Sequence, residues 1–233
     1  MNRTESYKNL EILYEDNHLI AVNKRPGDIV QGDRSEDKSL LDLLKDYIKV
    51  KYDKPGDVYV GLVHRLDRPV SGVVVFAKTS KALTRMNELF RDGDVRKTYW
   101  AVVKNRPEME DGTLIHHLRK NEKQNKSYVC KEGGKDGKRA ELDYRLAGFT
   151  DKYWLLEVNL KTGRHHQIRA QLSAIGSPIK GDLKYGADRS NRDGSIHLHG
   201  RNVKFIHPVK KVELNITAPP PKESLWGALA IDE

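Results

Sequence analysis

One aspartate of the chain lies between two arginines, in a short charged segment that separates two apolar runs. Asp67 has Arg65 and Arg68 as close neighbours in sequence, and the apolar runs are residues 58–63 and 72–77. Neighbouring cations stabilise an ionised carboxylate and lower its pKa. Such a carboxylate can act as a nucleophile or a general base at neutral pH. A surface cluster of ion pairs has the same composition, so this segment alone does not establish a catalytic role.

A second segment concentrates hydrogen-bond donors at the predicted start of a helix. A Thr-Gly turn at 162–163 precedes five polar side chains. These are Arg164, His165, His166, Gln167 and Arg169. The N-terminus of a helix with such donors suits a phosphate or a carboxylate. The histidines also permit a metal site, with Asp182 and residues 197–199 as further donors. We expect no metal, because adjacent helical residues point in different directions and the HExxH spacing is absent.

A third segment places two basic residues before two aromatic ones. Arg96 and Lys97 precede Tyr99 and Trp100 in a predicted strand, residues 97–103. Alternation along a strand puts Tyr99 on one face and Trp100 on the other. Aromatic side chains beside cations can stack on splayed RNA bases. An ordinary core or edge strand can show the same pattern.

The elements that position these segments are mostly strands. Apolar and β-branched runs predict strands at residues 12–14, 19–22, 58–63, 72–77, 97–103, 112–118, 140–146, 153–160, 196–198 and 212–216. Helical spacing predicts helices over 40–48, 80–90 and 164–175. Ser39 and Ser80 are the expected N-caps, Gly93 and Gly176 the expected stops, and residues 219–221 the end of regular structure.

Because strands dominate and the helices are not regularly interleaved, the pattern predicts an α+β fold. Its sheet is expected to be mixed and mainly antiparallel, flanked by helices and loops, rather than doubly wound. The Gly- and Lys-rich residues 131–138 are expected to form an exposed loop.

Composition limits the class of protein. The 233 residues are 37% hydrophobic and 32% charged, with a net charge of +9, which favours a polyanionic partner such as RNA but does not prove one. The single cysteine, Cys130, suits a reducing cytoplasm. The N-terminus lacks the apolar core of a signal peptide, and no apolar run approaches the roughly 20 residues that span a bilayer, so we expect no membrane association.

Several blocks in a fixed order resemble the RluA family of pseudouridine synthases. They occur at residues 19–27, 64–78, 97–99, 162–169, 181–186 and 207–208. The resemblance extends from about Ile12 to about Pro219, nearly the whole chain. Two positions depart from the commoner family pattern: Val70 stands where Thr is frequent and Gln171 where His is frequent. Neither is a catalytic position.

The resemblance implies a role for four residues. Asp67 is the catalytic residue, and Arg65 fills the gap left when the target nucleotide flips out of its helix. Tyr99 packs on the target base and is a candidate general base, while Arg169 pairs with Asp67. We expect further RNA contacts from His64, Arg68, Arg164, His166 and Gln167.

The resemblance also implies a domain plan and a substrate. We expect a catalytic domain at 11–220 with a central basic cleft, an N-terminal extension at 1–10 and a C-terminal tail at 221–233. The family's S4-like RNA-binding domain is not expected. The substrate is expected to be structured RNA, either ribosomal or transfer RNA, without a cofactor. The enzyme is expected to be a cytoplasmic monomer with no obligatory protein partner.

Other functions and other reaction routes stay open. The same scaffold can serve a non-catalytic RNA-binding protein, and His165, His166 and Asp182 can serve a metal-dependent nuclease. Within the synthase interpretation, the carboxylate can attack C1′ of the sugar or C6 of the base, or can remove a proton from C2′.

Overall fold

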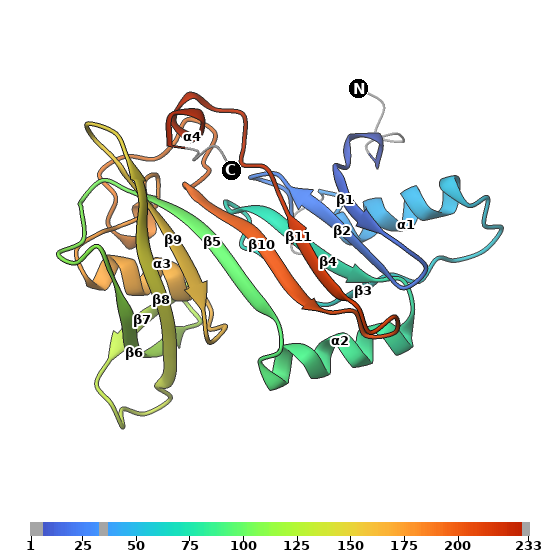
Figure 1. The fold of residues 1–233 in the computed structure, drawn as a ribbon, viewed down its shortest axis with the longest axis horizontal. Helices are drawn as coiled ribbons and strands as arrows, with labels where there is room; N and C mark the ends of the chain where they lie inside the picture. Colours follow the sequence, from blue (N-terminus) through green and yellow to red (C-terminus); the bar gives the residue numbers. More distant parts are fainter. Residues whose placement is uncertain (1–6, 33–36, 230–233) are drawn as a thin grey trace. The chain divides into compact units, whose positions relative to one another are not determined.

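The computed structural model of the chain describes residues 7–32 and 37–229, which divide into two units of sheet and helix (Figure 1). The first unit is Met1–Val95 with Asn202–Pro219, and the second is Arg96–Arg201 with Pro220–Glu233. The chain therefore leaves the first unit after Val95, returns to it at Asn202 and leaves it again after Pro219. The predicted N-terminal extension and C-terminal tail lie partly outside the described residues.

Antiparallel pairing builds the sheet of the first unit. Its strands are β1 (Ile12–Glu15), β2 (Leu19–Lys24), β3 (Gly61–Leu62), β4 (Ser71–Ala77), the end of β10 (Leu198–Ile206) and β11 (Glu213–Thr217). β2 pairs with β1 and with β4, and in the second pairing Leu19 lies opposite Ala77. β11 pairs with β10, where Asn202 lies opposite Thr217. Thus residues from both ends of the chain form one unit.

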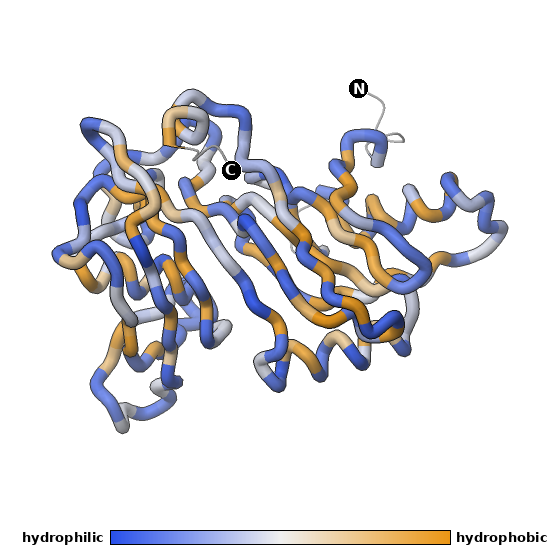
Figure 2. The backbone as a smooth tube through the Cα atoms, in the orientation of Figure 1, coloured by the Kyte–Doolittle hydropathy of each residue, from blue (hydrophilic) through white to orange (hydrophobic). Residues whose placement is uncertain are grey.

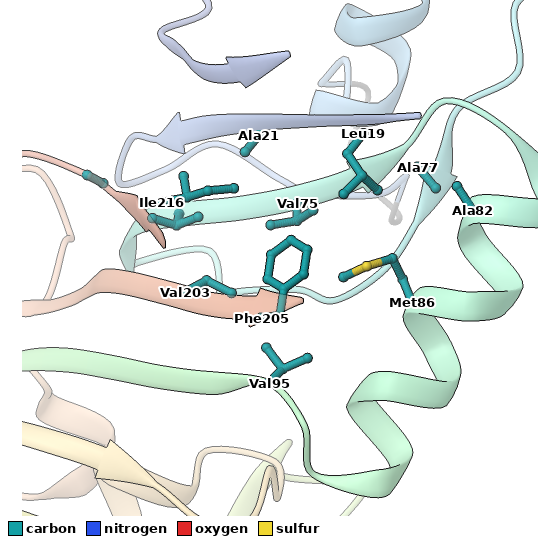
Figure 3. Packing of buried hydrophobic residues seen from close by; sticks show 12 residues of the cluster. Leu19, Ala21, Val75, Ala77, Ala82, Met86, Val95, Val203, Phe205 and Ile216 are labelled. Carbon is teal, nitrogen blue, oxygen red and sulfur yellow. The ribbon is translucent and has the colours of Figure 1, made fainter. Parts of the chain in front are cut away.

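A buried apolar cluster holds this unit together (Figure 3). It joins β2, β4, β10 and β11 to the helix α2 (Ser80–Asp92). The labelled members are Leu19, Ala21, Val75, Ala77, Ala82, Met86, Val95, Val203, Phe205 and Ile216. Hydropathy along the backbone follows the same pattern, with apolar stretches on the strands and polar residues in many of the connecting loops (Figure 2). Burial of these side chains is the main favourable contribution to folding of the unit.

Two helices of the first unit begin at side-chain caps. Ser39 and Asp42 form a reciprocal capping box at the start of α1 (Leu40–Lys51), which confirms the predicted cap. For α2 the prediction of Ser80 was wrong by one residue: Thr79 has extended backbone, and its hydroxyl accepts a hydrogen bond from the Ala82 N–H at 3.1 Å. The helix ends at Gly93, as predicted.

The second unit contains a five-stranded antiparallel sheet. Its strands, in spatial order, are β5 (Arg96–Val103), β9 (Trp154–Leu160), β8 (Lys138–Phe149), β6 (Asp111–Asn121) and β7 (Lys126–Cys130). The helices are α3 (Gln167–Ala174), the short 3-10 helix η2 (Leu183–Tyr185) and α4 (Ser224–Leu229). Trp226 and Leu229 of α4 are buried against Trp100, Val102 and Leu155 of the sheet. None of the helices in the described residues has both the length and the apolar sequence needed to cross a bilayer.

The predicted fold class is confirmed, but several element bounds were wrong. The expected strand at 58–63 is reduced to the two residues of β3, and α3 begins at Gln167 rather than Arg164. The strand expected at 196–198 is instead β10, which continues to Ile206, and its residues Asn202–Ile206 pair with β11. The polar strand β7 was missed. Regular structure also does not end at the prolines, because α4 follows them and packs on the sheet. Residues 131–137 form the expected loop.

Candidate active site

The loop that carries Asp67 is tied down by a buried lysine. Asp67 is half-buried in the connection between β3 and β4. Lys24, at the end of β2, is 1% exposed and donates hydrogen bonds to the carbonyls of Arg25 and Arg68 at 3.0 Å. It also donates to the carbonyl of Val70 at 2.7 Å. The carbonyls of Arg68 and Val70 follow Asp67 closely in sequence, so one ammonium group fixes the backbone on the C-terminal side of Asp67.

The same lysine places a positive charge near Asp67. Burial lowers the pKa of Lys24 to about 8, although the carboxylates of Asp28 and Asp67 favour its charged form. Lys24 is therefore mainly protonated at neutral pH. Its ammonium group thus places a positive charge near Asp67.

The neighbours of Asp67 in the predicted motif differ in exposure. Arg65 is exposed and borders a small cavity of about 100 Å³. His64 stacks on Phe90, with 5.1 Å between ring centroids, and its Nε2 accepts a hydrogen bond from the Val75 N–H at 3.1 Å. His64 thus holds the start of the loop against β4 and α2. The exposed Arg68 forms an ion pair with Asp37 at 2.8 Å. RNA contacts by these side chains stay a prediction.

In the second unit a buried ion pair fixes Arg169. Its Nε donates to Oδ2 of Asp182 at 2.6 Å and its Nη2 donates to Oδ1 at 2.8 Å. The two side chains are 6% and 1% exposed. The Tyr185 ring centroid lies 5.0 Å from the Arg169 guanidinium carbon. A bidentate contact of this kind holds a guanidinium in one orientation.

The turn before α3 is held by one glutamine. The Gln167 side chain is buried, and its Oε1 accepts hydrogen bonds from the Arg164 N–H at 2.9 Å and the Thr162 hydroxyl at 2.8 Å. Its Nε2 donates to the carbonyl of Glu141 at 3.0 Å. These bonds close a turn over 164–167, and α3 begins at the last residue of this turn, Gln167. Gln167 therefore positions the backbone at Arg164, whose side chain is exposed.

Two histidines in this turn belong to a hydrogen-bonded network. The rings of His165 and His166 stack with 3.8 Å between centroids, and His166 has left-handed backbone with φ 52°. His166 Nδ1 lies 2.9 Å from the Tyr185 hydroxyl, which accepts a hydrogen bond from the Ser127 N–H at 2.8 Å. His165 Nδ1 lies 2.9 Å from the Ser127 hydroxyl. The network joins β7, the turn and the segment around Arg169.

Tyr99 lies half-buried in β5, opposite Val158 of β9. The Thr98 hydroxyl donates a hydrogen bond to Asn159 at 2.8 Å, and Trp100 packs under α4. By alternation along β5, Tyr99 lies on the other face. Lys97 shares the Tyr99 face by alternation. A Cβ placed on Gly163 would lie 3.7 Å from Lys97 Nζ, so this face approaches the 162–164 turn. Burial lowers the pKa of Lys97.

The predicted residues are therefore gathered within each unit. The first unit holds His64, Arg65, Asp67 and Arg68 on one loop, and the second holds Tyr99, Arg164, His166, Gln167 and Arg169. Asp67 belongs to the first unit and Arg169 to the second, and their pairing stays a prediction.

Three residues that support the site were not among the predicted catalytic or RNA-binding residues. The sequence did offer a sign of a special role for Lys24, because it is an ionisable residue at the end of an apolar strand. Asp182 was considered only as a metal ligand, and its partner turned out to be Arg169. Tyr185 had no signal beyond its block. Among the described residues, no group of three or more His, Cys, Asp or Glu side chains is placed to hold a metal ion.

Comparison with known sequences finds one family over most of the chain. The family described as RNA pseudouridylate synthase matches residues 18–174. Ribosomal large subunit pseudouridine synthase D of Zymomonas mobilis is 31% identical over 95% of this chain and 73% of its own length. tRNA pseudouridine synthase C of Vibrio parahaemolyticus is 32% identical over 90% of this chain and 89% of its own.

Solved structures show the same fold. Human RNA Pseudouridylate Synthase Domain Containing 4 aligns with a TM-score of 0.79 at 25% identity, over 94% of this chain and 91% of its own. Human RNA Pseudouridylate Synthase Domain Containing 1 aligns with a TM-score of 0.71 at 23% identity, over 95% and 87% of the two chains.

Proposed function

Because the chain belongs to the RNA pseudouridylate synthase family, it is an isomerase that acts on RNA, and we propose that Asp67 is its catalytic carboxylate. We further propose that the substrate is ribosomal or transfer RNA. Relatives named for the ribosomal large subunit and for tRNA support both substrate classes equally. The target uridine is flipped out of its helix before the reaction.

The observation that carries the assignment of Asp67 is the way its loop is held. A surface cluster of ion pairs does not require a buried ammonium group that fixes the backbone at Arg68 and Val70. A catalytic carboxylate does, because a misplacement of about 1 Å can cost about a hundredfold in rate. Lys24 is therefore a positioning residue in this proposal.

The reaction breaks the N1–C1′ bond, rotates the uracil and joins C5 to C1′. The carboxylate of Asp67 attacks C1′ or C6, or removes a proton from C2′, and all three routes need it ionised and oriented. Arg169 stabilises the ionised form, and Asp182 in turn fixes the guanidinium. Tyr99 takes the proton that leaves C5 of the rotated base, directly or through water. The atoms balance without a redox step or a co-reactant.

RNA is bound by basic side chains in this proposal. Arg65 fills the space of the flipped nucleotide, and its exposure suits that role. The remaining expected contacts are His64, Arg68, Arg164, His166 and Gln167. Of these, Gln167 acts through the turn that presents Arg164. We retain a cytoplasmic monomer without an obligatory protein partner as the expected state; the single cysteine suits a reducing compartment.

The test is tritium release from tRNA and ribosomal RNA labelled at C5 of uridine. Wild type should release tritium from at least one RNA class, and Asp67→Asn should lose at least about a thousandfold in rate because the carboxylate acts as the nucleophile or the base in every route. Asp57→Asn, which changes an exposed carboxylate of the same unit, is the matched control and should retain wild-type release. Release by Asp67→Asn at the control rate would remove Asp67 from the mechanism.

A further inference from the structure

The second unit contains a polar pocket that none of the proposed catalytic residues uses. Its volume is about 520 Å³, within the range of about 300–1,000 Å³ that small-molecule sites occupy. The side chains that matter for binding are Lys104, Asn105, Tyr153, Lys180, Arg189 and Asn191. The lining contains three cationic side chains against one carboxylate, Asp188, so the pocket favours an anion.

An aromatic ring lies beside one of these cations. Tyr153 packs against the buried cluster under α4, and its backbone N–H and carbonyl both bond to Thr150. Lys180 Nζ lies 5.8 Å from the ring centroid. A fixed aromatic ring beside a cation is the arrangement on which single-stranded RNA bases stack.

One of the cations is held away from solvent. Lys180 is half-buried and its Nζ donates to Asn191 Oδ1 at 2.7 Å. Burial lowers the pKa of Lys180, while Glu223 and Asp193 favour its charged form. A partly desolvated ammonium group beside an aromatic ring binds a phosphate oxygen more strongly than a fully hydrated one.

The floor of the pocket belongs to the same segment as the ion pair that fixes Arg169. Gly181 and Gly186 line the pocket, and Asp182 lies between them. Gly181 has φ +89°, and a Cβ there would lie 2.8 Å from both Asn191 Nδ2 and the Ser195 carbonyl, so the floor has no room for a side chain. A ligand in the pocket therefore contacts the segment that orients a catalytic residue.

We propose that this pocket binds a nucleotide of the RNA substrate other than the target uridine, with its base on Tyr153 and its phosphate on Lys180 and Arg189. The proposal rests on the proposed function, which supplies RNA as the ligand. It adds a second contact point on the substrate, remote in sequence from the Asp67 loop, which contributes to selection of the RNA.

Stacking is tested with Tyr153→Leu, which removes the aromatic face but keeps an apolar side chain against α4. Its matched control is Phe149→Leu, at the end of β8 just before the turn that carries Tyr153, where the residue is 72% exposed and outside the pocket lining. The Kd for bulk tRNA and for ribosomal RNA, measured by filter binding, should rise about tenfold in Tyr153→Leu and stay within about twofold in Phe149→Leu. Tyr153→Phe keeps the ring and should bind as wild type does.

Phosphate binding is tested with Arg189→Gln against Arg91→Gln, an exposed arginine of the first unit. The slope of log Kd against log salt should fall by about 1 in Arg189→Gln and should not change in Arg91→Gln. Equal slopes in the two variants, together with equal affinity in Tyr153→Leu and Phe149→Leu, would overturn the pocket as an RNA site.

Free nucleotides are the other source of the same chemistry. Titration of wild type with UMP and AMP by calorimetry should show no saturation below the millimolar range. Micromolar binding that Tyr153→Leu abolishes, with RNA affinity unchanged, would overturn the assignment to RNA and identify a nucleotide site instead.

The failure of the proposed function can be told apart from the failure of this inference. The proposed function fails if wild type releases no tritium from labelled RNA. If wild type is active but the pocket variants bind RNA as their controls do, only this inference is refuted. Circular dichroism and melting temperature confirm that each variant is folded.

Discussion

The ion pair between Arg169 and Asp182 buries two charged groups and holds the Arg169 guanidinium in one orientation. Both side chains are almost fully buried and the contact is bidentate. Burial of a charged pair is costly, and replacement of such pairs by apolar residues is often neutral for stability. Its presence here is therefore better explained by orientation of the guanidinium than by a contribution to folding.

Asp182→Asn should reduce both stability and turnover. The substitution leaves the charge of Arg169 buried beside a neutral amide, which costs about 3–5 kcal/mol in comparable pairs. We expect a lower melting temperature and a lower kcat for tritium release. The control is Asp143→Asn, which breaks a surface ion pair with Lys161 in the same unit. It should lower the free energy of unfolding by less than about 1 kcal/mol. An unchanged kcat in a folded Asp182→Asn protein would contradict the orienting role.

Lys24→Met should slow the reaction without direct loss of a catalytic group. Methionine fills a similar space but removes three hydrogen bonds, each worth about 1 kcal/mol. The carbonyls of Arg25 and Arg68 keep backbone hydrogen bonds from Asp28 and Gly27. The loop around Asp67 then becomes less well ordered, so kcat should fall by about tenfold or more while the KM for RNA changes little. Lys49→Met, on the exposed side of α1, is the control. A raised KM with a normal kcat would assign Lys24 to RNA binding instead.

At the residue scale, chemical type and local spacing singled out the segments that contain Asp67, Tyr99 and Arg169, and the resemblance to the RluA family implied the role of each residue. Neither identified what holds these residues. Lys24 reaches carbonyls more than forty residues away, and Asp182 reaches Arg169 from beyond the end of α3. Such pairings depend on the tertiary fold and do not follow from local spacing.

At the scale of elements, one carboxylate connects a strand to a helix and to a second strand. Glu15, at the end of β1, accepts hydrogen bonds from Tyr47 at 3.0 Å, Lys51 at 2.6 Å and Lys78 at 2.8 Å. Burial raises the pKa of Glu15, but hydrogen bonds from these groups and from Tyr52 outweigh that effect and lower it to about 2. α1 is thereby attached to the edge of the first sheet.

The stabilisation by Glu15 should depend on pH in a defined direction. Since the folded-state pKa is about 2 and the ordinary value is 4.5, the stabilisation is complete above about pH 5 and is lost as the pH falls toward 2. Glu15→Gln should cost up to about 3 kcal/mol at pH 7 and about half of that at pH 3, measured by urea unfolding. A difference between the two proteins that is constant over this range would mean that the carboxylate charge is not responsible.

Elements with strong periodicity or clear caps were predictable, and elements that depend on pairing were not. The capping box at Ser39 and the apolar strand β4 are local signals. β7 has a polar, partly exposed sequence and forms because β6 pairs with it across a short turn. α4 is a single short segment after prolines, and only the apolar surface beneath it explains why it is helical.

At the scale of the whole molecule, the net charge predicts how RNA binding depends on salt. The charge of +9 should make RNA binding depend strongly on salt, because each phosphate contact releases counterions. We expect the Kd for RNA to rise about a thousandfold or more between 50 and 200 mM salt, for six or more phosphate contacts. The melting temperature over the same range is the control for folding. A Kd independent of salt would assign binding to stacking and shape alone.

The division into two units was only partly predictable from composition. Two of its three boundaries fall at the start of β5 and within β10, between Arg201 and Asn202, where the sequence is not rich in glycine, proline or serine. The third falls between Pro219 and Pro220, inside a run of three prolines. Hydrophobic pattern predicts strands but does not show which sheet core each strand joins.

The interrupted first unit has a consequence for protein synthesis. Its core needs Val203, Phe205 and Ile216, which the ribosome adds about a hundred residues after Val95. At about 5–20 residues per second, β2, β4 and α2 wait about 5–20 seconds for the strands that cover them. The five strands β5 to β9 of the second unit all lie between Arg96 and Arg201 and are made before that time, whereas α4, which packs on them, follows later. These strands can therefore pair while the apolar strands of the first unit still lack part of their core, which lengthens the time in which those apolar strands can contact neighbouring chains.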